Sequence, residues 1–307
     1  MSRIYEALKQ AELERKDIFE PQPEPTAGDI VFPGAGEPLP TKAFVDLEKI
    51  TLHKWTGSTA FLPTLAEGGP CVEQFRGLRT QIYLLRVEKA LKTVLVSSGM
   101  PAEGKTFVAA NLAISLARSQ DRRVLLIDGD LRQPSIYKLL GAPNSPGLAD
   151  YLGGNATATA ILQCDDTPGK DENHSVRAIS NLAFIPAGDC GDDAPEIAGN
   201  HRAEELITIL SPYFDWIIID SPPVLAVTDA VDLARAADGV LLVAREATTP
   251  YAIAQRAQAA FSNSRILGFV LNAVRYSPRN EYSYGYGYGY AYHASNGADH
   301  KQKRRKT

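Results

Sequence analysis

Short runs of apolar residues recur along the chain, and segments with helical spacing separate them. Five runs have the length of strands: 93–97, 123–127, 215–220, 239–244 and 266–271. The segments of helical spacing cover 72–90, 104–119, 201–212, 229–237 and 250–262. Strands that are apolar throughout and alternate with helices are typical of a parallel sheet covered on both faces. The pattern predicts a doubly wound α/β fold, with loops and one short helix over 142–178.

The N-terminal part follows a different pattern. In residues 1–17, Ile4, Leu8 and Ala11 fall on one stripe of a short amphipathic helix. Residues 18–70 are rich in Pro, Gly and Glu and have no sustained period, which is typical of a linker. An isolated short helix is marginally stable in water. We therefore expect the helix to pack on its own domain or to dock on a partner or a membrane, and the pattern leaves these open.

The α/β domain is predicted to span 71–275, and 276–307 form a tail. Tyrosines occupy every second position in part of this tail, spaced mostly by glycine: Tyr282, Tyr284, Tyr286, Tyr288, Tyr290 and Tyr292. Such a glycine density excludes a helix and weakens a core strand. Residues 301–306 carry five cations in six positions. They indicate a solvated end or a contact with an anionic membrane or partner.

Composition excludes several classes of protein. The 307 residues are 44% hydrophobic and 22% charged, as in an ordinary globular protein, and the net charge of −4 does not favour nucleic-acid binding. The three cysteines lack metal-ligand spacing and indicate reduced thiols. No apolar run approaches the roughly 18 residues of a membrane span, and no signal peptide is apparent. We expect a cytoplasmic protein that reaches a membrane through a partner.

A phosphate-binding loop lies between the first predicted strand and the helix that follows it. The motif G-x-x-x-x-G-K-[ST] comprises Gly99, Met100, Pro101, Ala102, Glu103, Gly104, Lys105 and Thr106, with Phe107 next in the helix. The backbone N–H groups of such a loop point at phosphate oxygens, and the helix N-terminus favours the anion. Lys105 would bind the terminal phosphates and Thr106 a Mg²⁺ ion. A chance glycine turn is the alternative, which the flanking strand and helix disfavour.

Three carboxylates follow predicted strands. Asp128 and Asp130 come directly after the strand at 123–127, and Asp220 ends the strand at 215–220. Ligands of open α/β sheets bind at the carboxyl ends of the strands. Two carboxylates two residues apart can share a cation and accept a proton from a nucleophile. The sequence therefore predicts an ATP·Mg²⁺ site at this edge.

Together these motifs resemble the bacterial tyrosine kinases of exopolysaccharide synthesis, over about residues 71–292. The resemblance also rests on the tyrosine-rich tail, on the Asp-x-Asp-Leu-Arg-x-Pro form of the second motif, and on an E-x-x-R-x-x-R pattern formed by Glu73, Arg76 and Arg79. In this family that helix makes subunit contacts in a ring. The chain departs from the family at Ala102, where many members have glycine.

The resemblance implies a P-loop kinase whose cofactors are ATP and Mg²⁺. Lys105 would bind the phosphates, Asp128 would act as base toward tyrosine, and Thr106, Asp130 and Asp220 would organise the metal. The catalytic set would be Lys105, Asp128 and Asp130. The tail tyrosines would be the phosphate acceptors, phosphorylated between neighbouring subunits.

The resemblance also implies partners. These are further copies of the chain in a homo-oligomer, a separate transmembrane chain-length regulator that activates the kinase, and a protein-tyrosine phosphatase. No nucleic acid is expected among them. The chain would lie in the cytoplasm, peripheral to the inner face of the plasma membrane.

Three other functions are alternatives to the kinase. A partitioning or cell-division ATPase carries a signature lysine after the first loop glycine, where this chain has Met100. A nucleic-acid module is suggested by tyrosine and glycine repeats beside basic residues, but the cations are few. A non-catalytic scaffold would not require the full set of motif residues.

Overall fold

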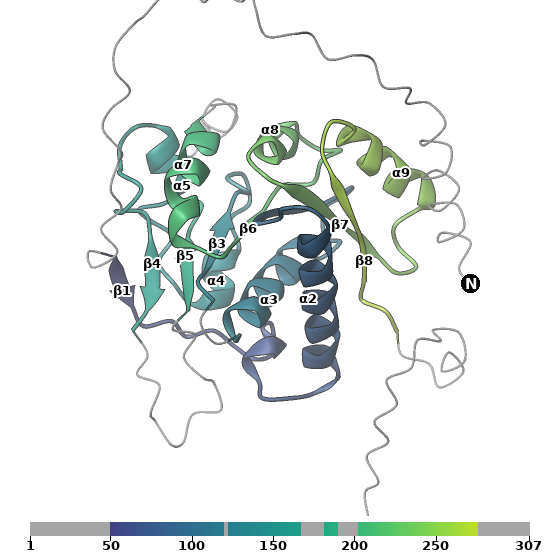
Figure 1. Ribbon diagram of the computed structural model, residues 1–307, viewed down its shortest axis with the longest axis horizontal. Helices are drawn as coiled ribbons and strands as arrows, with labels where there is room; N and C mark the ends of the chain where they lie inside the picture. The colour runs from purple at the N-terminus through teal and green to yellow at the C-terminus, as the bar shows by residue number, and fades with distance from the viewer. Residues whose placement is uncertain (1–49, 120–121, 167–180, 190–201, 276–307) are drawn as a thin grey trace, which may run out of the picture. The chain divides into compact units, whose positions relative to one another are not determined.

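The structure is a computed structural model that describes residues 50–119, 122–166, 181–189 and 202–275 (Figure 1). The chain groups into two units, Asp29–Val274 and the two ends, Met1–Gly28 with Arg275–Thr307. All helices and strands given below belong to the first unit. The predicted N-terminal helix and the tyrosine-rich tail lie outside the described residues.

An eight-stranded sheet forms the centre of this unit, in the order β1-β4-β5-β3-β6-β2-β7-β8. Its strands are β1 (Thr51–His53), β2 (Thr93–Ser98), β3 (Val124–Asp128), β4 (Gln163–Asp165), β5 (Leu182–Ile185), β6 (Trp216–Asp220), β7 (Gly239–Arg245) and β8 (Ile266–Asn272). Neighbouring strands are parallel, except that β4 and β5 are antiparallel. The predicted mainly parallel sheet is confirmed.

Helices cover both faces of the sheet (Figure 1). They are α2 (Pro70–Glu88), α3 (Lys105–Ala117), α4 (Ile136–Leu140), α5 (Leu148–Leu152), α7 (Arg202–Leu210), α8 (Asp229–Arg235) and α9 (Tyr251–Ala260), with 3₁₀ turns η2 (Pro63–Leu65) and η4 (Ser211–Tyr213). One hydrophobic core contains residues of α2, α3 and α4, and the other contains residues of α5, α7, α8 and α9. This is the doubly wound arrangement that the pattern predicts.

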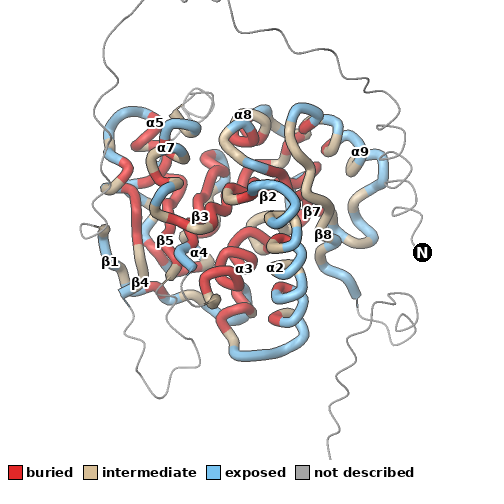
Figure 2. The backbone as a smooth tube through the Cα atoms, in the orientation of Figure 1, coloured by how far each residue is buried: buried red, intermediate tan, exposed pale blue. Residues whose placement is uncertain are grey.

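The strands bury both of their faces because their side chains alternate between the two cores. In β3, Val124 and Leu126 belong to one core, and Leu125 and Ile127 to the other. Figure 2 shows the central strands and α3 buried, whereas the outer side of α2 is exposed. Strands buried on both faces need apolar residues at every position. This is why uninterrupted apolar runs in the sequence predict these strands.

Residues 50–70 correct part of the predicted linker. Here β1 pairs with β4, the backbone N–H of Trp55 donates to Asp165 Oδ1 at 3.1 Å, and the Trp55 ring packs edge-on against Phe184. Leu62 and Leu65 are also buried. Single large apolar residues spaced irregularly hold this segment, and they give no periodic signal. The strands β4 and β5 and the helix α4 were missed as well because each is only three to five residues long.

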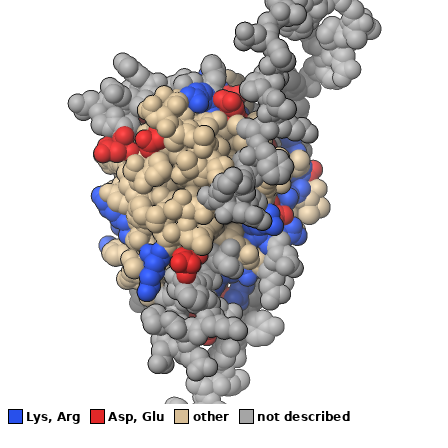
Figure 3. Space-filling model, turned by 90° about the vertical axis from the view of Figure 1, so that its left-hand side faces the viewer, with Lys and Arg blue, Asp and Glu red and all other residues tan. Residues whose placement is uncertain are grey.

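Figure 3 shows the side of the molecule that carries β1, β4, α5 and α7. The described surface visible there is mostly uncharged, with basic and acidic side chains at its margins. Within the described part of the chain, no helix combines the length and apolarity that crossing a bilayer requires.

Candidate active site

The sheet topology brings the three nucleotide motifs together. β6 lies between β3 and β2, so the phosphate-binding loop after β2 and the carboxylates ending β3 and β6 share one edge. Asp128 and Asp220 are direct register partners in the β3–β6 pair. All predicted members of the ATP and metal sites lie at this edge, which is the place that the strand ends indicated.

The phosphate-binding loop connects β2 to the first residue of α3, which is Lys105. Gly104 precedes the helix at φ 94°, a conformation that favours glycine, and a Cβ there would lie 1.9 Å from the side-chain nitrogen Nδ2 of Asn272. No side chain caps α3. Its first N–H groups therefore remain available to an anion.

Lys105 lies among carboxylates. Its Nζ is 2.9 Å from Asp130 Oδ2 and 4.0 Å from Asp220 Oδ2. The Thr106 hydroxyl donates to Asp220 Oδ2 at 2.6 Å. Burial lowers the pKa of Lys105, but the charges of Asp220 and Asp130 outweigh this and raise it above its ordinary value of 10.5. The ammonium is thus charged at neutral pH and links the loop to both acidic strand ends.

Asp128 is fully buried and organises the segment that follows it. Its Oδ2 accepts the N–H groups of Ser135 and Ile136, each at 3.0 Å, and its Oδ1 accepts the Asp130 N–H at 3.3 Å. Burial raises the pKa of Asp128 to about 6, against the lowering effect of these hydrogen bonds. Gly129 is required beside it, since a Cβ there would lie 2.7 Å from the carbonyl oxygen of Asp220.

The charge balance of the site favours a cation. Three carboxylates and one ammonium leave an excess of two negative charges when all are ionised. Burial raises the pKa of Asp220 to about 7, and its Oδ1 is buried without a hydrogen-bond partner. An orphaned carboxylate oxygen beside the Thr106 hydroxyl is the donor set that a Mg²⁺ ion would use. The residues present therefore fit this ion.

Protein groups alone do not form a complete metal cage here. Across the described segments, no three His, Cys, Asp or Glu side chains are arranged to hold a cation by themselves. This agrees with the usual behaviour of Mg²⁺, which takes one or two carboxylates and completes its shell with phosphates and water.

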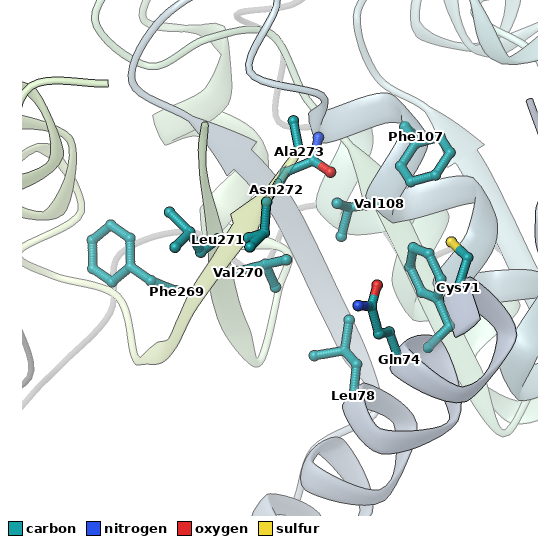
Figure 4. A pocket seen from close by; sticks show the side chains of 12 residues that line it. Cys71, Gln74, Leu78, Phe107, Val108, Phe269, Val270, Leu271, Asn272 and Ala273 are labelled. Atoms are coloured by element: carbon teal, nitrogen blue, oxygen red, sulfur yellow. The ribbon is translucent and has the colours of Figure 1, made fainter. Parts of the chain in front are cut away.

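An apolar groove borders the end of the phosphate-binding loop (Figure 4). It has a volume of about 480 Å³ and lies between α2, the start of α3 and the edge strand β8. Phe107 and Val108 face Asn272 and Ala273 across it. A groove of this size and lining is suited to a flat, largely apolar group such as a nucleoside base.

Two polar connections at the site were missed from sequence. Arg132 forms a bidentate pair with Asp229 at 2.9 and 3.3 Å, which joins the segment after β3 to α8. Glu103 is buried inside the loop and contacts Thr249 from the segment after β7. Each pair is separated by about a hundred residues or more, so only the fold reveals it. The only hint in the sequence was that each motif contains a charged residue, Arg132 or Glu103, that needs a partner.

The three residues of the E-x-x-R-x-x-R pattern have different surroundings. Arg76 pairs with Glu73 at 2.8 Å on the exposed side of α2. Arg79 instead turns toward α3 and donates to the Ser115 carbonyl at 2.6 Å. A polar pocket of about 410 Å³ lies beside Arg76, Arg79 and Arg118. Glu73 and Arg76 are accessible to a second subunit, whereas Arg79 also fastens α2 to α3.

Comparisons with known proteins agree with this geometry. The ParA family model, described as NUBPL iron-transfer P-loop NTPase, matches residues 89–293. Tyrosine-protein kinase YwqD of Bacillus subtilis (strain 168) is 33% identical over 212 residues, covering 68% of this chain and 84% of that protein. The kinase domain of Escherichia coli tyrosine kinase ETK superposes with a TM-score of 0.62 at 30% identity, covering 76% of this chain and 87% of that one.

The match to a longer relative covers only part of that protein. Tyrosine-protein kinase wzc of Salmonella typhimurium is 34% identical over 215 residues, which are 68% of this chain but 28% of that protein. The chain therefore belongs to the bacterial tyrosine kinases, a group with the ParA-like P-loop NTPase fold.

Proposed function

We propose that the protein is an ATP-dependent protein-tyrosine kinase that phosphorylates the tyrosines of its own tail. The reaction transfers the γ-phosphoryl group of ATP to a phenol oxygen and releases ADP and a proton. The observation that carries the proposal is the cluster of Lys105, Thr106, Asp130 and Asp220 at one sheet edge, in a chain related to tyrosine kinases.

The residues of the site would have two roles, which are to bind ATP and to stabilise the charge of its phosphates. Phosphates would lie on the loop N–H groups and the start of α3, with Lys105 at the terminal phosphate. Bound Mg²⁺ would neutralise charge on the phosphates, held by Thr106, Asp220 and Asp130. The groove beside Phe107 and Asn272 would receive the base. This assignment leaves the γ-phosphate on the side of the acidic strand ends.

Asp128 is the proposed base toward the tyrosine hydroxyl. A phenol has a reference pKa near 10, so it attacks poorly unless a carboxylate takes its proton as the bond forms. Burial of Asp128 raises its pKa to about 6, which brings its proton affinity closer to that of an effective base at neutral pH. Its oxygens accept three N–H groups. A carboxylate has about four acceptor sites, so Oδ1, which accepts one N–H group, keeps a lone pair for the proton.

The acceptors are Tyr282, Tyr284, Tyr286, Tyr288, Tyr290 and Tyr292. We propose that each tail is phosphorylated by a neighbouring subunit of a homo-oligomer, whose contacts include Glu73 and Arg76. The kinase would regulate exopolysaccharide synthesis from the inner face of the membrane. A separate transmembrane activator would hold the kinase there. A protein-tyrosine phosphatase would remove the phosphates from its tyrosines.

The test is where the phosphate of γ-labelled ATP goes. Incubation of the purified full chain with labelled ATP and Mg²⁺ is expected to place label on the protein as phosphotyrosine. Release of free phosphate without labelled protein would instead indicate an ATPase of the partitioning type. The Asp128→Asn variant should bind nucleotide but label slowly, because it keeps the side-chain shape and loses the base.

A further inference from the structure

We propose that Glu103 is a positioning residue that holds the phosphate-binding loop in its binding conformation, with Thr249 as its anchor. The inference rests on the proposed nucleotide-binding function and adds a requirement to it. A phosphate-binding loop needs its glycines, its lysine and its hydroxyl residue. The motif asks nothing of position 103, yet this chain buries a carboxylate there, with 3% of the residue exposed.

Both oxygens of the Glu103 carboxylate are used within the loop and its surroundings. Oε2 accepts the N–H of Met100 at 2.8 Å, which closes the loop on itself. Oε1 accepts the hydroxyl of Thr249, a residue of the segment between β7 and α9. The side chain therefore links the loop to the segment between β7 and α9.

The loop needs this link because part of its backbone has a disfavoured conformation. Ala102 has φ 62°, in the left-handed region where a Cβ is in steric conflict and glycine is preferred. Gly104, two residues on, has φ 94°. Glycine at 102 would adopt this conformation without conflict, whereas alanine must be held there by contacts around it.

Neighbouring strands supply those contacts. Arg245 at the end of β7 donates to the Ala102 carbonyl at 3.2 Å, and Asn272 at the end of β8 donates to the Glu103 carbonyl at 2.9 Å. The Thr249 hydroxyl in turn accepts the Arg245 N–H at 2.8 Å. Thr249 thus connects the Glu103 side chain to the same strand end that holds Ala102. The loop is pre-organised by a network that reaches it from two strands.

The experiment compares ADP affinity among variants of the full chain, by calorimetric titration with ADP and Mg²⁺. Thr249→Val keeps the side-chain shape and removes the hydroxyl. We expect it to raise the Kd about tenfold and to raise the KM for ATP more than it lowers kcat. Thr248→Val is the matched control, since it removes the same hydroxyl from an exposed residue of the same segment.

Rescue by glycine separates positioning from a general loss of stability. Ala102→Gly added to Thr249→Val is expected to recover about fivefold of the lost affinity, and to give a smaller gain in the wild-type background. Equal gains in both backgrounds, or a Thr249→Val variant that binds ADP like wild type, would overturn the inference. Wild-type chain that binds ADP but forms no phosphotyrosine would overturn the kinase proposal alone. Wild-type chain that does not bind ADP would overturn both.

Discussion

At the scale of single residues, the main feature of the site is that it buries more carboxylates than cationic side chains. Asp128 and Asp220 are fully buried, and Lys105 is the cation that faces Asp130 and Asp220 in the described structure. Burial raises the pKa values of Asp128 and Asp220 to about 6 and about 7, from 3.8. Such a site is strained when empty at neutral pH, and it is relieved by a cation or by protons.

This strain predicts a pH dependence of stability. Between pH 4 and pH 7 the folded chain holds protons on Asp128 and Asp220 that the unfolded chain releases. The free energy of unfolding therefore falls as pH rises, by about 1 kcal/mol per pH unit for each group. Asp128 contributes from pH 4 to about pH 6 and Asp220 up to about pH 7, above which the fall levels off. Denaturant unfolding without nucleotide or Mg²⁺ at pH 5, 6, 7 and 8 measures it.

The variant Asp220→Asn isolates the contribution of one carboxylate. It should flatten the slope between pH 5 and pH 7 and be more stable than wild type at pH 7.5. Asp232→Asn removes a carboxylate from the surface of α8 instead and serves as the control. A slope that Asp220→Asn leaves unaltered would show that this carboxylate is not strained in the folded protein.

At the scale of elements, the acidic segment after β3 is held by a second element. The Arg132–Asp229 pair joins it to α8, and Asp229 is buried. A buried carboxylate that loses its partner is costly because it keeps its desolvation penalty. The segment that carries Asp128 and Asp130 therefore depends on α8 for its position.

We expect Arg132→Ala to lower the free energy of unfolding by about 2 kcal/mol. The matched control is Arg235→Ala on α8, whose pair with Asp232 is exposed and 3.7 Å long, and which should cost less than about 0.5 kcal/mol. Urea unfolding of the two variants at pH 7.5 gives the comparison. Similar losses would mean that the Arg132 pair contributes no more than a surface ion pair.

Most of the helices and strands were predictable from sequence. The strands β2, β3, β6, β7 and β8 and the helices α2, α3, α7, α8 and α9 lie within a few residues of their predicted bounds. Uninterrupted apolar runs and strand-end carboxylates carry that signal. The sequence around the short strand β1 and Trp55 has no periodic pattern of apolar residues that would predict their packing. The Glu103–Thr249 and Arg132–Asp229 pairs depend on contacts between distant residues, which local pattern does not contain.

At the scale of the whole molecule, the proposed function couples assembly to the charge of the tail. Phosphorylation of all six tyrosines would add about 9 to 12 negative charges at neutral pH. A tail that enters the acid-lined site of a neighbour would then be repelled by Asp128, Asp130 and Asp220. The number of phosphates, rather than any one tyrosine, would set the state of assembly.

We predict that incubation with ATP and Mg²⁺ lowers the mass of the oligomer, measured by light scattering on a size-exclusion column. Arg76→Ala should lower it without ATP, because Arg76 is exposed beside Glu73 on the outer side of α2. Arg122→Ala removes an exposed arginine that pairs with Asp215 instead, and serves as the control. An unchanged mass with a fully phosphorylated tail would contradict the coupling of assembly to tail charge.

The central claim is that Lys105 and the strand-end carboxylates direct phosphate to the tail tyrosines. Its most direct test is mass spectrometry of tail peptides from purified chain incubated with ATP and Mg²⁺, beside Lys105→Met treated in the same way. The account predicts several phosphotyrosines among Tyr282, Tyr284, Tyr286, Tyr288, Tyr290 and Tyr292 in the wild type, and none in Lys105→Met by itself. Phosphorylation of the isolated Lys105→Met chain, or a wild-type tail without phosphate, would contradict it.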